Sequence, residues 1–150
     1  MSWQDYIDKN LIGSGNMHSS AIIGLKDGCY WAHGGTYLPQ PEEIKHIQRC
    51  LEDLSLINSS GITINGVKFF GLQSGVDGDT RFIFFKKGPA GGCIYTTKQT
   101  FIIGVYGNPT GVNSLQEDLQ GQKAQEKVVN PALCNSSVKF IVKYLINLGY

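Results

Sequence analysis

The sequence predicts an α+β fold built on one antiparallel sheet of about seven strands. From position 61 onward, short runs rich in β-branched and aromatic residues are separated by Gly, Asn and Asp turn residues. Strands and helices do not alternate regularly, which disfavours a doubly wound parallel sheet. Both ends of the chain carry apolar residues at helical spacing, so terminal helices are expected to cover the sheet.

The first expected element is a helix over residues 3–11. Ser2 is suited to cap it, and Asp5 favours its first turn. Two large aromatic residues within the first six indicate that this terminus is docked rather than frayed. One face of the helix would hold Trp3, Tyr6, Ile7 and Leu11.

A hairpin and a second helix are expected next. The runs 21–25 and 29–33 predict two strands joined by a tight turn at 26–28, with Trp31 on the second strand. Pro41, Glu42 and Glu43 are typical of a helix start. The apolar positions that follow at helical spacing are Ile44, Ile47, Leu51 and Leu54.

Five further strands are predicted as a meander: 61–64, 67–73, 80–87, 93–97 and 100–107. Residues 74–79, SGVDGD, are expected to form a loop. The stretch 136–150 predicts a closing helix that Gly149 ends. Its buried stripe would hold Val138, Ile141, Val142, Leu145 and Leu148.

Composition narrows the function classes. The 150 residues are 41% hydrophobic and carry a formal charge of +1, which suits one domain and does not suggest a dedicated nucleic-acid or membrane-surface binder. No secretory signal and no run of membrane-spanning length is evident. We therefore expect a soluble, cytosolic protein.

The chemistry-bearing residues do not form a recognisable catalytic or metal motif. The four cysteines and three histidines are scattered, and none of the cysteines belongs to a C-x-x-C pair. The glycines at 13, 15, 91 and 92 lack the flanking residues of a phosphate-binding loop. Asp77, Asp79 and Arg81 are more typical of solvated turn residues than of a site. We expect no metal, no cofactor and no enzymatic activity.

Five aromatic residues occupy positions that short helices and strands would leave partly exposed. They are Trp3, Tyr6, Trp31, Tyr144 and Tyr150. Any one of them could simply fill a core between helix and sheet. Terminal helices on the same sheet face would instead bring them together as an aromatic groove, which suits a preformed polyproline helix. Hydroxyl and indole groups could then donate hydrogen bonds to the carbonyls of that ligand.

The chain resembles the profilin family over nearly its whole length. The matching pieces are SWQDYID with Leu11, the hairpin from AIIG to WA, the helix start PEEI, KKGPAGG, CIYTTKQTFIIGVYG and the closing PALCNSSVKFIVKYLINLGY. The resemblance implies an antiparallel sheet with the terminal helices on one face and the remaining helices on the other.

The same resemblance implies an adaptor that regulates actin polymerisation in the cytoplasm and cytoskeleton. Profilins bind monomeric actin, proline-rich proteins such as formin-type actin nucleators, and phosphoinositides, and they are not enzymes. The implied partners exclude nucleic acid, and the chain is expected to be a monomer. The implied proline-binding residues are Trp3, Tyr6, Trp31, Tyr144, Leu145 and Tyr150. The implied actin-binding residues are Lys68, Leu72, Arg81, Lys86, Lys87, Asn135, Ser136 and Lys139.

One segment departs from the family pattern, because roughly twenty extra residues, at about 111–130, precede the closing helix. Ser114 to Glu117 has the form of a capping box, so a helix is expected to start there. Ser114, Leu115 and Leu119 could rest on their own domain or contact actin; we favour the contact with actin.

Two other functions remain open from the residues alone. One is a small ligand-sensing or scaffold domain that holds a small molecule between sheet and helices. The other, ranked lower, is catalysis. Retention on immobilised polyproline would distinguish the adaptor from both.

Overall fold

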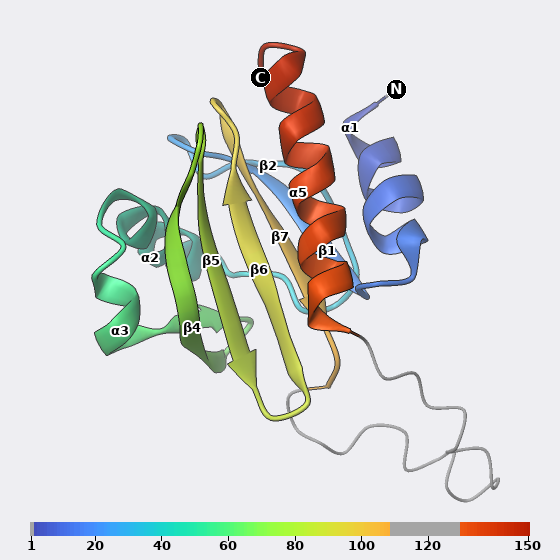
Figure 1. Cartoon of the computed structure of the whole chain (residues 1–150). Coiled ribbons are helices and arrows are strands. Elements are labelled where there is room, and N and C mark those ends of the chain that lie inside the picture. The colour runs from blue at the N-terminus through green and yellow to red at the C-terminus, as the bar shows by residue number, and fades with distance from the viewer. Residues whose placement is uncertain (1, 109–129) are drawn as a thin grey trace, which may run out of the picture.

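The computed structural model describes residues 2–108 and 130–150, and its centre is a seven-stranded antiparallel sheet (Figure 1). The strand order is β2-β1-β7-β6-β5-β4-β3. The strands are β1 (Ser19–Gly24), β2 (Tyr30–Gly34), β3 (Ile62–Ile64), β4 (Val67–Asp77), β5 (Thr80–Lys87), β6 (Ala90–Thr96) and β7 (Thr100–Tyr106). The predicted fold class and strand number are confirmed.

Helices cover both faces of the sheet. The N-terminal elements and α5 lie side by side on one face, whereas α2 and α3 lie on the other (Figure 1). Their bounds are α1 (Trp3–Asp5), η1 (Tyr6–Leu11), η2 (Ile12–Ser14), α2 (Pro41–Glu52), α3 (Leu56–Ser60) and α5 (Pro131–Asn147). Every residue of β6 and β7 is buried, because these central strands are covered on both faces.

Each face of the sheet has its own apolar cluster. Toward α2, residues such as Ile47, Phe69 and Phe101 have no accessible surface. Toward α5, Ile7, Leu11 and Val138 are equally buried. The layers between sheet and helices are therefore filled by side chains.

The N-terminal helix forms as expected, and its later turns are π-helical instead of α-helical. Ser2 and Asp5 make a reciprocal capping box, with each side chain accepting from the other residue's backbone N–H. From Tyr6 to Leu11 the turns are π-helical, with the Ile12 amide donating to the Ile7 carbonyl. Trp3, Tyr6, Ile7 and Leu11 all pack toward the same cluster, which confirms the predicted face.

The closing helix is longer than predicted at its start and shorter at its end. It begins at Pro131, because the Asn130 side chain accepts from the Ala132 amide and caps it. It ends at Asn147, so Leu148 is 53% exposed and the prediction that it belongs to the buried stripe was wrong. Gly149 then turns the chain with a φ of +100°.

Two further features, the end of β4 and the start of α2, bear on the position of the site. Ser74 to Asp77 continue β4 rather than forming a loop, because Asp77 pairs with Thr80 across a two-residue turn. Glu43 caps α2 through the Gln40 amide and also accepts from the amides of Asn65 and Gly66, which joins the helix start to the β3–β4 turn.

Candidate functional site

Trp3 lies at the centre of a cluster of aromatic rings between the N-terminal helix, β2 and the end of α5. Its ring centroid lies 4.9 Å from that of Trp31, 5.0 Å from that of Tyr150 and 5.8 Å from that of Tyr6. Tyr6 continues the cluster to Tyr144 at 6.2 Å. The structure thus brings together the five aromatic residues singled out in the sequence.

A β-bulge turns Trp31 toward this cluster. Ile22 pairs with Ala32 and Ile23 pairs with Tyr30, so Trp31 is the extra residue between them. A bulge changes which face a side chain points to. Trp31 and Ala32 therefore both pack toward the face that carries Trp3, although strand alternation alone would separate them.

A side-chain hydrogen bond and close packing at Gly34 hold the N-terminal helix against β2. The Gln4 side-chain amide donates to the His33 carbonyl at 2.8 Å. A Cβ on Gly34 would lie 3.1 Å from a methyl carbon of Ile7 and 2.9 Å from one of Ile12. The missing side chain at Gly34 thus lets the helix approach closely enough for Trp3 to meet Trp31.

Tyr150 is positioned by the end of α5. Its amide donates to the Leu145 carbonyl at 2.9 Å, and the Gly149 amide donates to the Ile146 carbonyl at 3.0 Å, which together form a Schellman motif. The Tyr150 carbonyl accepts from the Gln99 amide at 2.8 Å. The last residue is therefore tied both to its helix and to the β6–β7 turn.

The rings differ in what they offer to a ligand. Tyr144 and Tyr150 are 45% and 38% exposed, Trp3 and Trp31 are half-buried, and only an edge of Tyr6 is accessible. Burial and the neighbouring phenols of Tyr144 and Tyr150 raise the pKa of Tyr6. Its hydroxyl is a donor at neutral pH, as for any tyrosine. Leu145 is fully buried in the same apolar cluster, so it supports the rings and offers no surface to a ligand, unlike the prediction that it binds proline directly.

A second surface is the part of the sheet that α5 leaves uncovered, along β4 and β5. Phe70 is 66% exposed and pairs with Lys86, whose side chain lies on the same face. Leu72 is 63% exposed at an irregularity between Gly71 and Gln73. Phe70 was missed in the sequence, although in the pair Phe69-Phe70 strand alternation requires one ring to face outward.

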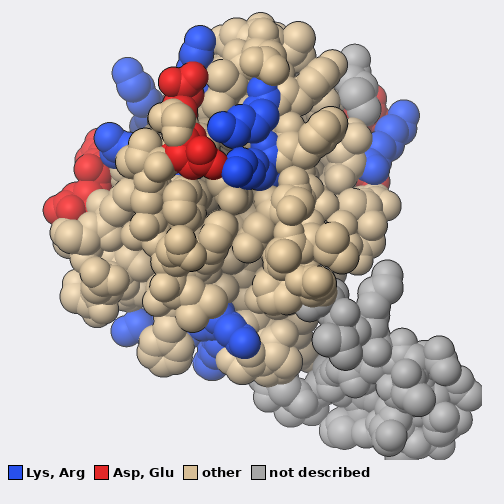
Figure 2. Space-filling view, in the orientation of Figure 1, with Lys and Arg blue, Asp and Glu red and all other residues tan. Residues whose placement is uncertain are grey.

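Partly exposed aromatic rings continue this open face toward α5. Phe82 and Phe84 are half-buried, with ring centroids 5.0 Å apart, and Phe82 lies 5.9 Å from the ring of Tyr95, which is buried. Figure 2 shows this side of the molecule as a broad uncharged field, with basic and acidic side chains together at its top and basic side chains near its bottom. The surface is therefore uncharged at its centre and charged at its ends.

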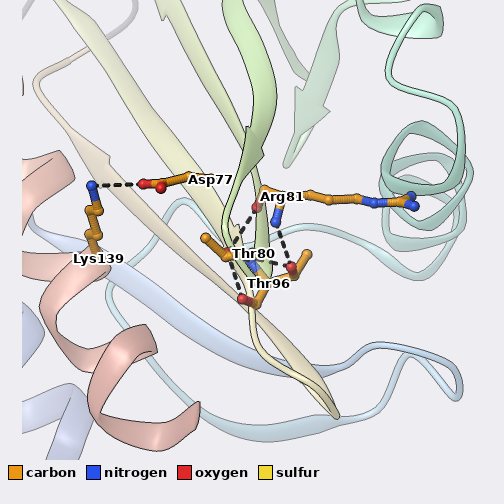
Figure 3. A network of polar contacts seen from close by, with 5 residues as sticks. All are labelled: Asp77, Thr80, Arg81, Thr96 and Lys139. Atoms are coloured by element: carbon orange, nitrogen blue, oxygen red, sulfur yellow. Dashed lines mark hydrogen bonds and ion pairs between the residues drawn. The ribbon is translucent and has the colours of Figure 1, made fainter. Parts of the chain in front are cut away.

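Three of the basic residues that the resemblance implies for actin binding do not lie together. Arg81 is the second residue of β5, whereas Lys86 and Lys87 end this strand, roughly 17 Å away at the usual strand rise. The Arg81 guanidinium donates to the Leu51 carbonyl on the α2 face, and Figure 3 shows it directed away from Asp77 and Lys139. By alternation Lys86 faces the open surface with Phe84, whereas Lys87 shares the opposite face with Phe85.

The start of α5 borders the open surface. Lys139 forms an ion pair with Asp77 at 2.8 Å, which links the middle of α5 to the end of β4 (Figure 3). This ammonium group, followed by that of Lys143, lowers the pKa of Asp77. Ser136 is exposed and Asn135 half-buried. Lys68 is exposed on β4, next to the buried Phe69.

The predicted contacts of Ser114, Leu115 and Leu119 lie outside the described residues, as does the whole segment 111–129. Within residues 2–108 and 130–150, no group of three or more His, Cys, Asp or Glu side chains could hold a metal ion. No helix in the same ranges is both long and apolar enough to cross a bilayer.

Comparison with known proteins identifies one family. The profilin family model matches residues 1–150. A profilin from Trypanosoma brucei brucei is 65% identical over 150 residues, which covers all of both chains. The crystal structure of Acanthamoeba castellanii profilin II is 28% identical with a TM-score of 0.75, and the match covers 99% of this chain and 100% of that one. Mouse profilin IIa, solved in complex with a double repeat from the FH1 domain of mDia1, is 24% identical with a TM-score of 0.67 over all of both chains, which is a likeness of fold.

Proposed function

The chain belongs to the profilin family, and from that premise we propose that it binds monomeric actin and proline-rich segments and so regulates actin polymerisation. The two ligands would occupy different surfaces. Proline-rich segments would bind the aromatic groove formed by Trp3, Tyr6, Trp31, Tyr144 and Tyr150. Actin would bind the open face of β4 and β5 together with the start of α5.

The observation that carries this proposal is the ring cluster around Trp3, with three ring centroids within 6 Å of its own. A polyproline helix is already extended before it binds, so it loses little conformational entropy on a rigid aromatic surface. Its carbonyls have no internal partners and can accept from indole and phenol groups. The ties at Gln4 and Tyr150 hold the rings in place before the ligand arrives.

The proposal for actin rests on the exposed apolar side chains of the open face. Phe70 and Leu72 expose about two-thirds of their surface, which is unusual for two neighbouring large residues on one strand. Lys86 adds a cation beside Phe70. Arg81 would not contact actin through this surface, because its side chain points to the other face of the sheet. The segment 111–130 would add contacts at the α5 end of this surface.

Three further parts of the proposal follow from family membership. The protein would act by binding rather than by catalysis, and it would work as a monomer in the cytoplasm, where its actin partner is found. Basic side chains near the bottom of the open face would attract phosphoinositides, since anionic headgroups are drawn to clustered Lys and Arg.

The deciding experiment is retention of the purified chain on immobilised poly-L-proline, with release by free oligoproline. Retention is expected at physiological salt, because stacking and hydrogen bonds to neutral groups are only weakly screened. In parallel, the chain should raise the concentration of unpolymerised actin in a pelleting assay. A chain that passes through the proline column unretarded would contradict the groove, and one that leaves actin polymerisation unchanged would contradict the open face.

A further inference from the structure

A stripe of exposed apolar side chains runs along the outer side of α5. It holds Leu133, Phe140, Tyr144 and Leu148, at spacings of seven, four and four residues. These spacings keep the four side chains on one side of the helix. Val142, on the opposite side, is fully buried in the apolar cluster between α5 and the sheet. The stripe therefore faces away from the sheet, where a surface helix usually carries polar side chains.

Tyr144 belongs both to this stripe and to the aromatic groove. Its ring centroid lies 6.2 Å from that of Tyr6, which in turn lies 5.8 Å from that of Trp3. A ligand that follows these rings reaches α5 at Tyr144. Phe140 lies one helical turn away on the same side of α5. It is 68% exposed, more than any other large apolar side chain in residues 2–108 and 130–150. The groove is thus continuous with an exposed phenyl ring that the proposed function leaves unused.

The N-terminal elements stay beside α5 past the end of the groove. The Asn16 side-chain amide donates to the Ser137 hydroxyl at 3.0 Å, which ties the chain after η2 to the first half of α5. Figure 1 shows the N-terminal elements and α5 side by side. Ser137 lies one turn before Phe140, so the backbone that carries this ring is held in place before a ligand binds.

Phe140 offers a different chemistry from the rings of the groove. The indoles and phenols of the groove have N–H and O–H donors for the carbonyls of a proline-rich ligand. A phenyl ring and a leucine side chain have no donor, so Phe140 and Leu133 offer apolar contact alone. Contact of this kind favours the ligand side chain that buries the most apolar area, such as leucine or phenylalanine.

The spacing along α5 also sets which ligand residue meets Phe140. At the usual helical rise, Phe140 lies about 6 Å along the axis from Tyr144. A polyproline helix rises about 3.1 Å per residue. The ligand residue about two positions beyond the one on Tyr144 therefore stands level with Phe140.

We propose that Phe140 is a specificity residue of the proline groove, and that it selects segments in which a large apolar residue stands two positions beyond the proline run. The proposal rests on the proposed function, because it requires a proline-rich segment in the groove. Phe140 lies at one end of the groove only. It therefore reads one flank of the ligand and gives the bound segment a single direction.

The test compares peptides in titrations of the intact chain, followed by tryptophan fluorescence. A proline octamer is extended by Ala-Leu or Ala-Ser at its C-terminus, or by Leu-Ala or Ser-Ala at its N-terminus. At one terminus the leucine peptide should bind about fivefold more tightly than the serine peptide, because its side chain buries apolar area on Phe140. At the other terminus the two peptides should bind equally.

Phe140→Ser should bind the leucine and serine peptides equally. Val76→Ser is the matched control, because Val76 is 66% exposed but lies on β4, away from the groove, and it should keep the fivefold preference. Equal binding of leucine and serine peptides by the parent at both termini, or a leucine preference that survives in Phe140→Ser, would overturn the proposal while the plain octamer still binds. Loss of the preference in Val76→Ser would overturn it as well. An octamer that does not bind the parent at all would contradict the proposed function together with this inference.

Discussion

Replacing Gly149 by Ala tests whether the end of α5 shapes the aromatic groove. Gly149 has a φ of +100°, and an added Cβ would meet no atom within 4 Å. The substitution therefore introduces a conformational cost without a steric clash. That cost acts on the peptide that places Tyr150 against Trp3.

The magnitude follows from the contacts. A non-glycine residue in the left-handed region costs about 1–2 kcal/mol, and the lower entropy of the unfolded chain returns about 0.5–1 kcal/mol. The net loss of stability is then about 1 kcal/mol, or a fall of about 3 °C in Tm. Two contacts retain Tyr150: the hydrogen bond from the Gln99 amide to its carbonyl and the ring contact with Trp3. Together they contribute about 1–2 kcal/mol, which is similar to the conformational cost. Because the two energies are similar, Tyr150 should leave its place against Trp3 about half of the time, which weakens oligoproline binding about twofold.

The assay is oligoproline titration by tryptophan fluorescence, with Tm measured on the same samples. Gly66→Ala is the matched control, because Gly66 has a φ of +82° and equally free space but lies in the β3–β4 turn. Both variants should lose similar stability, and only Gly149→Ala should lose proline affinity. If Gly149→Ala bound oligoproline as tightly as Gly66→Ala does, Tyr150 would not be part of a groove positioned by this turn.

Three other predictions address the groove, the open face and the core. Trp3→Ala should abolish measurable polyproline retention, since one central interface aromatic contributes about 2 kcal/mol or more, and should leave actin sequestration intact; loss of both would mean that the terminal helix had unfolded. Lys86→Glu and Lys87→Glu should both slow association with acidic actin at low salt, as measured by stopped flow. Only Lys86→Glu should also shorten the lifetime of the complex, because of the two lysines only Lys86 lies on the open face. Equal dissociation rates for the two variants would show that this assignment is wrong. Burial raises the pKa of Tyr95 to about 12, so the stability that its neutral form contributes is complete below pH 10 and is lost as pH rises toward 12. Urea denaturation should therefore show Tyr95→Phe losing less stability than the parent between pH 9 and 11, and parallel losses would refute the assignment.

Local patterns in the sequence were enough for the architecture and for singling out the five aromatic residues that the structure brings together. Alternating apolar strands, the Ser2 cap and the helical spacing of Trp3, Tyr6, Ile7 and Leu11 depend on neighbours within a few residues, and the structure bears them out. The five aromatic residues stood out because short elements could not bury all of them. Their link to profilin came from matched motifs, which the family model over residues 1–150 confirms.

Tertiary structure decided which way the side chains point. The bulge that turns Trp31 toward Trp3 depends on how β1 pairs with β2. The register between two strands cannot be read from the order of apolar and polar residues within either strand. Leu145 lies beneath the rings because α5 packs its apolar stripe onto β6 and β7. The resemblance placed Arg81 together with Lys86 and Lys87, yet β5 holds Arg81 at the opposite end of the strand from both lysines and on the opposite face from Lys86. Sequence spacing determines which elements form, whereas the facing of a charged or aromatic side chain depends on contacts between residues far apart in the chain.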